Sequence, residues 1–591
     1  MVISAMLLCS VGAMVPVLNL KDAEIGQLSQ RLKAETRRPL TVRLSGVVEL
    51  KEPIVLGPEA SQVTFTGKAI LSGGTTLKSW KKVGNIWTQP LGFQASSLRQ
   101  LFVNGERWGR PTLPGGGKFY QFADYASPAE ASGEWNKGQN RMIYAPGDLN
   151  PNWLNRDEVE VMAHHLWVTS RMRIKEMDTA ARLVTFDRPS VFKLSNDYDG
   201  KAAVYRVINV REALDQPKTY FWDRKANEIQ TQTPMKAAVA PRLAEILRIQ
   251  GAKDVVFRWL NFSHTEYDLP GSAGDFQAGH TVPASVTLVD CERVRFENCG
   301  FTRLGNWGLE IIGKSTSNAV KDCTFDDLGA GGIKLGNGTS GTTIDSNSIT
   351  RGGRIFPSAC GIWGGLTGHN TIQYNRIHDF YYTGISLGWD WGFRDTEAKE
   401  NLIAGNDISL IGQGELSDMG GIYVLGKQPG SVIRNNRIQQ VFARGYGGWG
   451  IYLDEGSTGW TVLNNLVVDT KTGGFHIHYG GNNVIRNNIF IGSRSDAQLI
   501  RVRDDQQGPI TFEGNVVVSR DAAVPIVGPG WLKRDVSLRN NVFWTPAADR
   551  SLPFGADATN KYADPKLDTN NIPQISGWSG FDLKQVGPRK R

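Results

Sequence analysis

Acidic side chains stand beside glycine and aromatic residues in two short phrases of the C-terminal half of the chain, and two histidines lie in a third. Asp418 lies in "GQGELSDMGGIY", Asp454 and Glu455 lie in "GGWGIYLDEGSTG", and His476 and His478 lie in "GGFHIHYG". Hydrolysis of a glycosidic bond needs two carboxyl groups, one as the acid and one as the nucleophile or base. These three acids are therefore candidates for that chemistry, although acids at strand ends are more often solvated or bonded to turns.

Aromatic side chains are concentrated in the same part of the sequence. Sugar rings lay their apolar faces on aromatic surfaces, so these side chains are expected to bind substrate. The competing interpretation is that they pack loops against the rest of the fold. The residues concerned are Trp389, Trp391, Tyr423, Trp449 and Tyr452.

The histidines have several possible roles. His476 and His478 alternate along the chain, so they would point to one face of a strand. They could orient a carboxylate, bind a substrate hydroxyl or bind a metal. The sequence offers no convincing third ligand, so neither a metal nor another cofactor is expected. His264, in "FSHTEYDLPG", is expected to reach the same groove through a loop.

The elements that must hold these residues form a repeat from about residue 250 onward. Its strand-like phrases alternate apolar and polar residues and end in Asn or Cys, as in "VRFENCGF", "TTIDSNSI" and "SVIRNNRI". Successive members of the Asn or Cys column are 24 to 31 residues apart, the length of one coil of a solenoid. Period-two strands without intervening helices predict an all-β right-handed parallel β-helix. The column, expected to stack as a ladder, is Cys299, Cys323, Asn347, Asn375, Asn406 and Asn436.

A second column runs through the phrases from "GLEII" to "GFHIH". The second residue of each phrase is apolar and is expected to point into the core, so the third points outward. Because coils stack about 4.8 Å apart, these third residues would form a continuous outer stripe, with Asp454 and His478 two positions further on. The stripe comprises Glu310, Lys334, Trp363, Ser386, Tyr423, Tyr452 and His476.

Changes in composition and period divide the rest of the chain. The apolar stretch at the start resembles a secretory signal without its basic residues, so we expect a secreted or periplasmic protein. "AEIGQLSQRLKAE" predicts a helical N-terminal cap, and the period breaks in a region rich in Trp, Pro and Gly. We expect a signal at 1–18, the cap and first coils at 19–75, an inserted β-rich, sandwich-like domain at 76–245, the β-helix carrying the active site at 246–560, and a C-terminal cover and tail at 561–591.

Charge and cysteine content exclude several classes of protein. The net charge of +8 is small for 591 residues and the basic residues are scattered, so nucleic acid is not an expected partner. No segment is long and apolar enough to predict a membrane span. The five cysteines contain no CxxC pair, which disfavours a metal cluster and a disulfide scaffold. The sequence does not predict an oligomeric state.

The chain from about Val255 to Phe490 resembles the right-handed parallel β-helix glycosidases, most closely glycoside hydrolase family 141 and more distantly family 120. The matching phrases are "FSHTEYDLPG", "DLGAGGIKLG", "YYTGISLGWDWG", "GQGELSDMGGIYVLG", "GGWGIYLDEGSTG" and "GGFHIHYG". The resemblance implies breakdown of a plant or algal type polysaccharide, with α-L-fucosidase- or xylanase-like activity. The family's pair of catalytic aspartates falls on Asp418 and Asp454.

The register of the repeat conflicts with this pair. Asp418 precedes Gly421 by three residues, whereas Asp454 follows Gly450 by four. On straight, in-register strands this offset would separate the two by roughly 20 Å, but catalysis needs about 5–9.5 Å. Either a turn at "LSDMGG" folds Asp418 back over the sheet, or the partner of Asp454 is Glu455 or another acid.

Two other functions fit a parallel β-helix. A polysaccharide lyase would need a basic residue to take a proton beside a uronate carboxylate, and the outer stripe offers Lys334. A non-catalytic glycan-binding protein is also possible, because this fold alone implies no activity. The clustering of acids with aromatic residues favours an enzyme that acts on an oligo- or polysaccharide.

Overall fold

The structure is a computed structural model that describes most of the chain. The described residues are 15–20, 22–95, 97–197, 199–267, 274, 276–503, 507–532, 535–546, 559–575, 580–581, 583 and 585–589. Residues 1–14, most of the expected signal segment, lie outside them.

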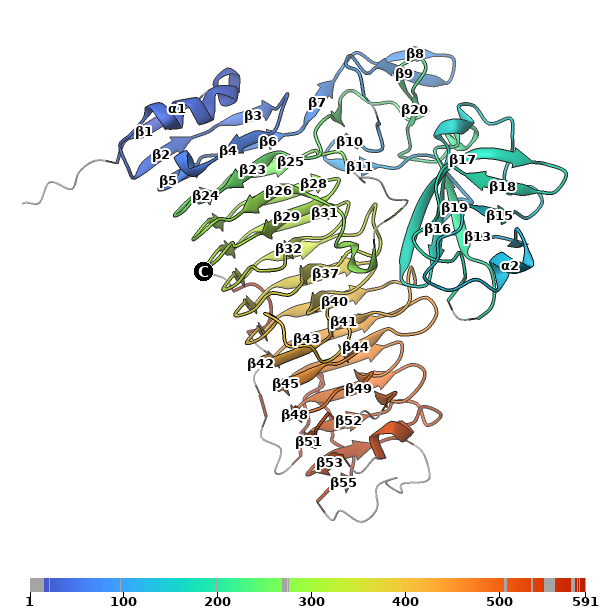
Figure 1. The fold of residues 1–591 in the computed structure, drawn as a ribbon, viewed down its shortest axis with the longest axis vertical. Coiled ribbons are helices and arrows are strands. Elements are labelled where there is room, and N and C mark those ends of the chain that lie inside the picture. The colour runs from blue at the N-terminus through green and yellow to red at the C-terminus, as the bar shows by residue number, and fades with distance from the viewer. Residues whose placement is uncertain are drawn as a thin grey trace, which may run out of the picture.

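The main body is a right-handed parallel β-helix made of three sheets (Figure 1). Each sheet takes strands from successive coils, and neighbouring strands in each sheet pair in parallel, as in a solenoid. Among the described residues, the first sheet has 14 strands from β1 (Val17–Asn19) to β53 (Val536–Arg539). The second sheet has 14 strands in this part of the chain, from β3 (Gly46–Glu49) to β55 (Lys561–Tyr562). The predicted fold class is confirmed.

The third sheet carries the predicted outer stripe. Its strands are β4 (Ile54–Leu56), β23 (Leu247–Gln250), β26 (Ala284–Val289), β29 (Trp307–Ile312), β32 (Ile333–Leu335), β35 (Ile362–Gly364), β38 (Ile385–Leu387), β41 (Gly420–Val424), β44 (Trp449–Leu453), β47 (Phe475–Ile477) and β50 (Leu499–Arg501). Tyr423 pairs with Tyr452, and Tyr452 pairs with His476, so the predicted register is correct. These three side chains are nevertheless buried, because loops and the inserted region cover this face.

Inward-facing apolar side chains form the core in stacked columns. Phe257 lies between Phe65 and Phe296, with ring centroids 4.8 and 4.9 Å away. Phe301 and Phe325 stack at 4.4 Å in the second sheet. Burying a side chain of this size stabilises the fold by about 1.5–3 kcal/mol. The repeat therefore builds a rigid wall on which outward side chains are held.

The Asn column forms a buried ladder, as predicted. Nδ2 of Asn375 donates to Oδ1 of Asn406 at 3.0 Å, and Nδ2 of Asn406 donates to Oδ1 of Asn436 at 2.9 Å. Each of these oxygens also accepts from the backbone N–H of the preceding member, so the ladder satisfies polar groups at a buried turn. Cys299 and Cys323 occupy the first positions and are buried thiols. The ladder continues through Asn465, Asn488, Asn515, Asn541 and Asn560.

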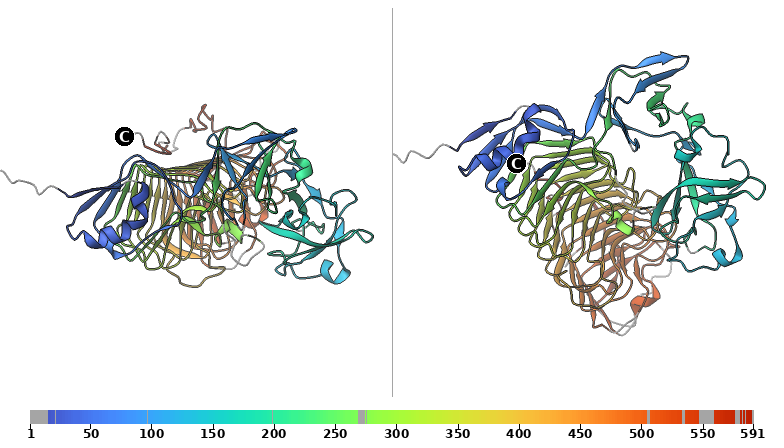
Figure 2. Two further views of the ribbon diagram at one scale, coloured as in Figure 1. Left: turned by 90° about the horizontal axis from the view of Figure 1, so that it is seen from above. Right: turned by 45° about the horizontal axis from the view of Figure 1, so that its top comes forward.

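The chain leaves the β-helix after β6 (Ala69–Ser72) and returns to it at β23. We call the intervening strands, from β7 (Gly74–Leu77) to β22 (Ala238–Pro241), the insert. They pair antiparallel in three sheets, the largest of which contains β16 (Glu160–His165), β17 (Val168–Asp178) and β19 (Val204–Ile208). Figures 1 and 2 show the insert standing beside the β-helix and reaching along it.

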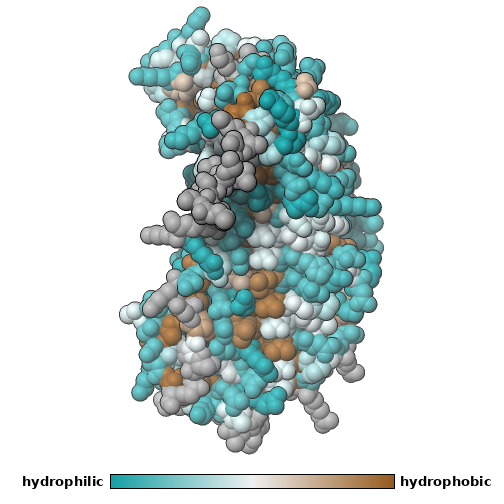
Figure 3. Space-filling model, turned by 90° about the vertical axis from the view of Figure 1, so that its left-hand side faces the viewer, coloured by the Kyte–Doolittle hydropathy of each residue, from teal (hydrophilic) through white to brown (hydrophobic). Residues whose placement is uncertain are grey.

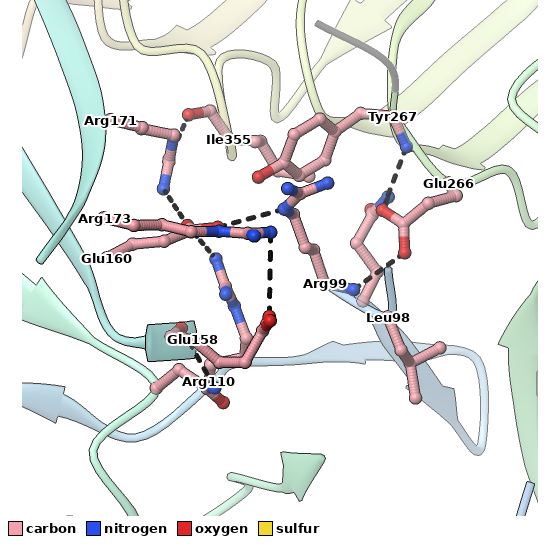
Figure 4. Close-up of polar contacts among 12 residues, drawn as sticks. Leu98, Arg99, Arg110, Glu158, Glu160, Arg171, Arg173, Glu266, Tyr267 and Ile355 are labelled. Carbon is pink, nitrogen blue, oxygen red and sulfur yellow. Dashed lines mark hydrogen bonds and ion pairs between the residues drawn. The ribbon is translucent and has the colours of Figure 1, made fainter. Parts of the chain in front are cut away.

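A buried ion cluster joins the insert to the β-helix (Figure 4). Glu160 on β16 accepts hydrogen bonds from Nε of Arg99 at 3.0 Å and from Nη2 of Arg110 at 2.6 Å. The backbone N–H of Arg99 donates to Glu266 of the β-helix at 2.7 Å, and its guanidinium lies 4.8 Å from the ring centre of Tyr267. Burial alone would raise the pKa of Glu160, but the two arginines hold this pKa well below its ordinary value. Breaking such a buried network typically costs about 3–5 kcal/mol, so the cluster fixes how the insert sits.

Both ends of the β-helix carry additional elements. The predicted N-terminal helix consists of a 3₁₀ turn, η1 (Asp22–Gln27), followed by α1 (Leu28–Ala34), whose Leu28 and Leu32 are buried. At the other end, Leu567 and Ile572 pack against apolar side chains of the second sheet. A further short helix, α2 (Pro128–Ala131), lies in the insert.

The outer surface away from the insert is mostly hydrophilic, with hydrophobic patches toward one end (Figure 3). Among the helices of the described residues, none is both long and apolar enough to cross a membrane.

Candidate active site

A cavity of about 710 Å³ lies over the third sheet at β41, β44 and β47. All three candidate acids line it, together with residues of the insert and of loops between coils. The lining comprises Trp135, Trp167, Gln277, Trp391, Asp418, Tyr446, Trp449, Tyr452, Asp454, Glu455, His476, His478 and Val502. Residues far apart in the sequence thus meet in one hollow.

Asp454 follows β44 directly and is 5% exposed. Its carboxylate accepts hydrogen bonds from the hydroxyls of Tyr423 at 2.5 Å and Tyr452 at 2.7 Å, and contacts Nδ1 of His478 at 2.9 Å. Burial alone would raise its pKa, but the contacts with His478 and the two tyrosines hold the pKa of Asp454 below its ordinary value. The same contact raises the pKa of His478, although burial opposes this rise. Asp454 is therefore held as an anion.

Asp418 lies in the turn before β41, with a left-handed φ of 52°. Its backbone N–H donates to the carbonyl of Tyr446 at 3.0 Å, and its own carbonyl accepts from the hydroxyl of Tyr382 at 2.6 Å. The side chain is half-buried. Its Oδ1 is buried and makes no hydrogen bond to any described residue. Burial, followed by the negative charge of Asp454, raises the pKa of Asp418 to about 7. Asp418 is therefore held as a protonated acid up to neutral pH.

The left-handed turn at Asp418 explains how this residue can lie near Asp454 despite the offset between them along the strands. It places Asp418 in the cavity with Asp454 instead of along the line of β41. The neighbouring turn approaches closely, because a Cβ on Gly447 would lie 3.0 Å from the backbone nitrogen of Asp418, and Gly447 has a φ of +89°. Glycine is favoured at such a position. Glu455 also lines the cavity, where its Oε2 accepts from the hydroxyl of Tyr479 at 2.7 Å.

The insert holds the turn that carries Asp418. Glu415 pairs with Nη2 of Arg206 at 3.1 Å, and its other oxygen lies 3.2 Å from Nε2 of His164. The backbone N–H of Ser417 donates to the carbonyl of Leu166 at 3.4 Å. Burial tends to raise the pKa of Glu415, but His164 and Arg206 lower it to about 2. We call Glu415, Arg206 and His164 the clamp.

Aromatic rings form one wall of the cavity. His476 stacks on Tyr452 with ring centroids 4.7 Å apart, and Trp449 meets His476 edge-on at 4.3 Å. Burial lowers the pKa of His476 to about 3, so its ring is neutral. Among the described residues, neither ring nitrogen of His476 has a hydrogen-bond partner, nor has Nε1 of Trp449. These atoms can bind a ligand that both donates and accepts.

Three of the candidate catalytic and substrate-binding residues lie outside the cavity lining. Nε1 of Trp389 donates to Oγ of Ser386 at 3.2 Å, and the Trp389 ring lies 6.1 Å from that of Tyr423. Tyr423 contacts the site through its hydroxyl, which donates to Asp454. The expectation for His264 is corrected, because this ring is fixed between Oγ of Ser72 at 3.0 Å and Nε of Arg303 at 3.2 Å. His264 follows β25 (Asn261–Ser263) in the second sheet, which faces another direction.

Lys334, the base considered for a lyase, is also occupied elsewhere. It pairs with Glu310 at 2.8 Å, and its Nζ donates to the carbonyls of His280 at 3.0 Å and Val282 at 2.7 Å. It is buried and does not line the cavity.

Several lining residues were not predicted as part of the site. Tyr446 could have been found, because "GYGGWG" places it three residues before Trp449. Gln277 donates to the hydroxyl of Tyr382 at 3.1 Å, but its sequence carries no comparable signal. Trp167 comes from the insert, whose position over the sheet is not encoded by the period of the coils.

Comparison with known proteins agrees with the architecture. A family model described as "Right handed beta helix region" matches residues 280–388 and 390–543. The chain contains a right-handed β-helix region. No curated protein matches it.

Solved structures extend this likeness. One described as "Glycoside hydrolase" has a TM-score of 0.69 and 20% identity, covering 86% of this chain and 93% of that chain. The complex of XylC with xylose has a TM-score of 0.41 and 14% identity, covering 94% and 87%. The Azotobacter vinelandii mannuronan C-5 epimerase AlgE4 A-module has a TM-score of 0.36 and 14% identity, covering 50% and 77%. The first of these shows a shared fold over most of the chain.

Proposed function

We propose that the protein is a glycoside hydrolase in which Asp418 and Asp454 are the catalytic pair. The observation that carries this proposal is their shared cavity, in which one carboxyl is buried beside a negative charge and the other is held by three polar partners. Environments that push two carboxyl pKa values apart are what separate an acid from a nucleophile or base. The similarity to a structure described as a glycoside hydrolase supports the same reaction class.

The proposed roles follow from protonation. Asp418 gives its proton to the glycosidic oxygen as the bond from that oxygen to the anomeric carbon breaks. Asp454 remains ionised and either attacks the anomeric carbon or removes a proton from the attacking water. Tyr423, Tyr452 and His478 keep the Asp454 carboxylate oriented. Glu455 remains an alternative partner, because it lines the same cavity.

The lining also supports a sugar as the ligand. A sugar hydroxyl can accept from Nε1 of Trp449 and donate to a ring nitrogen of neutral His476, both of which are buried polar groups. Leaving such groups unpaired costs about 1–3 kcal/mol each, so a polyhydroxylated ligand gains affinity by pairing them. The proposed substrate is a plant or algal type oligo- or polysaccharide, cleaved with α-L-fucosidase- or xylanase-like specificity by an exported enzyme.

A substrate panel tests this function. The purified protein is incubated with aryl fucosides, xylosides, galactosides and arabinosides and with plant and algal polysaccharides, and released reducing sugar is measured. We expect release from at least one substrate, and loss of that release in Asp454→Asn. Glycan binding without sugar release by the folded wild-type protein would contradict the proposal, and ultraviolet-absorbing unsaturated products would indicate a lyase instead.

A further inference from the structure

Two tryptophans at the cavity are much more exposed than the rest of its aromatic lining. Trp135 of the insert is 48% exposed and Trp391 of the β-helix is 56% exposed, and Val502 beside them is also exposed. Trp449 and Tyr452, in contrast, are buried, as is Asp454. The cavity therefore has a polar, catalytic floor and an apolar rim formed from both parts of the molecule. We call Trp135 and Trp391 the rim pair.

Neither rim ring is a loose surface side chain. Trp135 packs against Trp167 at 5.5 Å and Phe192 at 5.4 Å between ring centroids. Trp391 meets Trp389 edge-on at 5.5 Å, with an interplanar angle of 85°. Neighbouring rings thus support each tryptophan while much of its surface stays open. Exposed apolar area beside a polar pocket is typical of a ligand-binding surface.

The chemistry of the rim differs from that of the floor. The floor offers carboxyl, imidazole and indole N–H groups that recognise hydroxyls, whereas the rim pair offers aromatic surface. Such surface binds a ring with an apolar face, and this can belong either to a sugar or to an aryl group attached to a sugar. A chain of sugars supplies both kinds of contact in sequence, one unit at the floor and the next at the rim.

We propose that the rim pair is a second subsite, which binds the sugar unit on the leaving-group side of the bond that the floor cleaves. This inference rests on the proposed function. It makes the enzyme selective for an oligosaccharide over a glycoside whose leaving group has no ring. It also gives the insert a direct role in substrate binding, because Trp135 of the rim pair belongs to the insert.

Substrates with and without a second ring test the subsite. The pair is xylobiose with xylosyl fluoride, or a fucosyl disaccharide with fucosyl fluoride, according to the activity found in the panel. In Trp135→Ala and in Trp391→Ala, kcat/KM for the disaccharide is expected to fall by roughly tenfold. For the fluoride it stays unchanged, because fluoride cannot stack. Trp259→Ala is the matched control, since Trp259 is 53% exposed but does not line the cavity.

The two substrates and the corresponding aryl glycoside together distinguish a sugar subsite from an aglycone site and from general damage to the cavity. An equal loss on both substrates, or no loss on the disaccharide, would overturn the subsite. A loss confined to the corresponding aryl glycoside would show that the rim accepts an apolar aglycone rather than a sugar, which also overturns it. If the wild-type protein hydrolyses no glycoside, the proposed function fails, and calorimetry then tests the rim alone by comparing xylo-oligosaccharide binding to the wild type, Trp135→Ala and Trp259→Ala. Equal affinities in that measurement would remove the subsite as well.

Discussion

The two aspartates of the cavity are supported by different parts of the molecule. Asp454 stands at the end of a strand, and its partners Tyr423, Tyr452 and His478 come from three successive coils of the β-helix. Asp418 stands on a turn between strands, and the clamp from the insert holds that turn. The stacked strands of the β-helix fix the side chains that they carry. A turn between strands is fixed only if other parts of the chain contact it.

This difference in support corresponds to a difference in charge. Three polar partners keep Asp454 ionised, while burial next to that anion keeps Asp418 protonated. The pKa of Asp418 therefore depends on how closely the clamped turn approaches the sheet. The following substitutions test the strand-held acid first, then the turn-held acid, then the clamp and finally the repeat itself.

Removing the strand-held charge is expected to have the largest effect. Asp454→Asn keeps the shape of the side chain but abolishes its negative charge, so turnover should fall by about 10³-fold or more. The measurement is kcat on the best substrate of the panel, with the melting temperature as a control for folding. Full activity in this variant would remove Asp454 from the mechanism.

Removing the turn-held acid should have a smaller effect that depends on pH. In the wild type, kcat/KM should fall as the pH rises through about 7, because Asp418 must be protonated to donate and its pKa lies near this value. Asp418→Asn should lower turnover by about 10²-fold and abolish this fall. A pH profile of each protein checks both statements. A wild-type profile that stays flat well above pH 7 would argue against Asp418 as the acid.

Weakening the clamp should disturb only the turn-held acid. Glu415→Gln removes the charge that pairs with Arg206, so we expect kcat to fall about tenfold, because small displacements of a catalytic group are costly. The alkaline fall of the pH profile should shift in the same variant, which a loss of stability alone would not cause. Glu130→Gln is the control, since the Glu130–Arg141 pair at 2.9 Å lies within the insert. Identical profiles for the two variants would show that the clamp does not position Asp418.

Interrupting the Asn ladder should affect stability far more than activity. Asn406→Ala removes an amide that bonds to both neighbouring coils, so the free energy of unfolding should fall by about 1–3 kcal/mol. Denaturant titration measures this loss, and Asn570→Ala, at an exposed position, is the control. Turnover should stay close to the wild type. A strong loss of activity at unchanged stability would contradict the separation between repeat and site.

What could be predicted from the sequence follows the same division. Side chains alternate along each strand, and equivalent positions recur one coil later. The pairing of Tyr423 with Tyr452 in neighbouring strands and the placement of Asp454 near His478 could therefore be predicted. The turn at Asp418 was one of two alternatives, because a left-handed backbone between strands leaves no periodic signal. Trp167 and Gln277 were missed for a related reason: contacts between the insert and the coils are set by tertiary packing. His264 was misplaced because it follows a strand of the second sheet, and the sequence does not show which way the loop after that strand turns.

The insert leaves the β-helix without breaking the stack of coils. β5 (Val63–Thr66) pairs with β24 (Val256–Arg258), and β6 pairs with β25, so the coils on either side of the insertion stack in unbroken register. A different domain inserted between β6 and β23 would leave the pairing of the coils unchanged. It would replace Trp135 and Trp167, the insert residues that line the cavity. A replacement domain would also have to supply the contacts that Glu415 makes with Arg206 and His164, because these contacts hold the turn that carries Asp418.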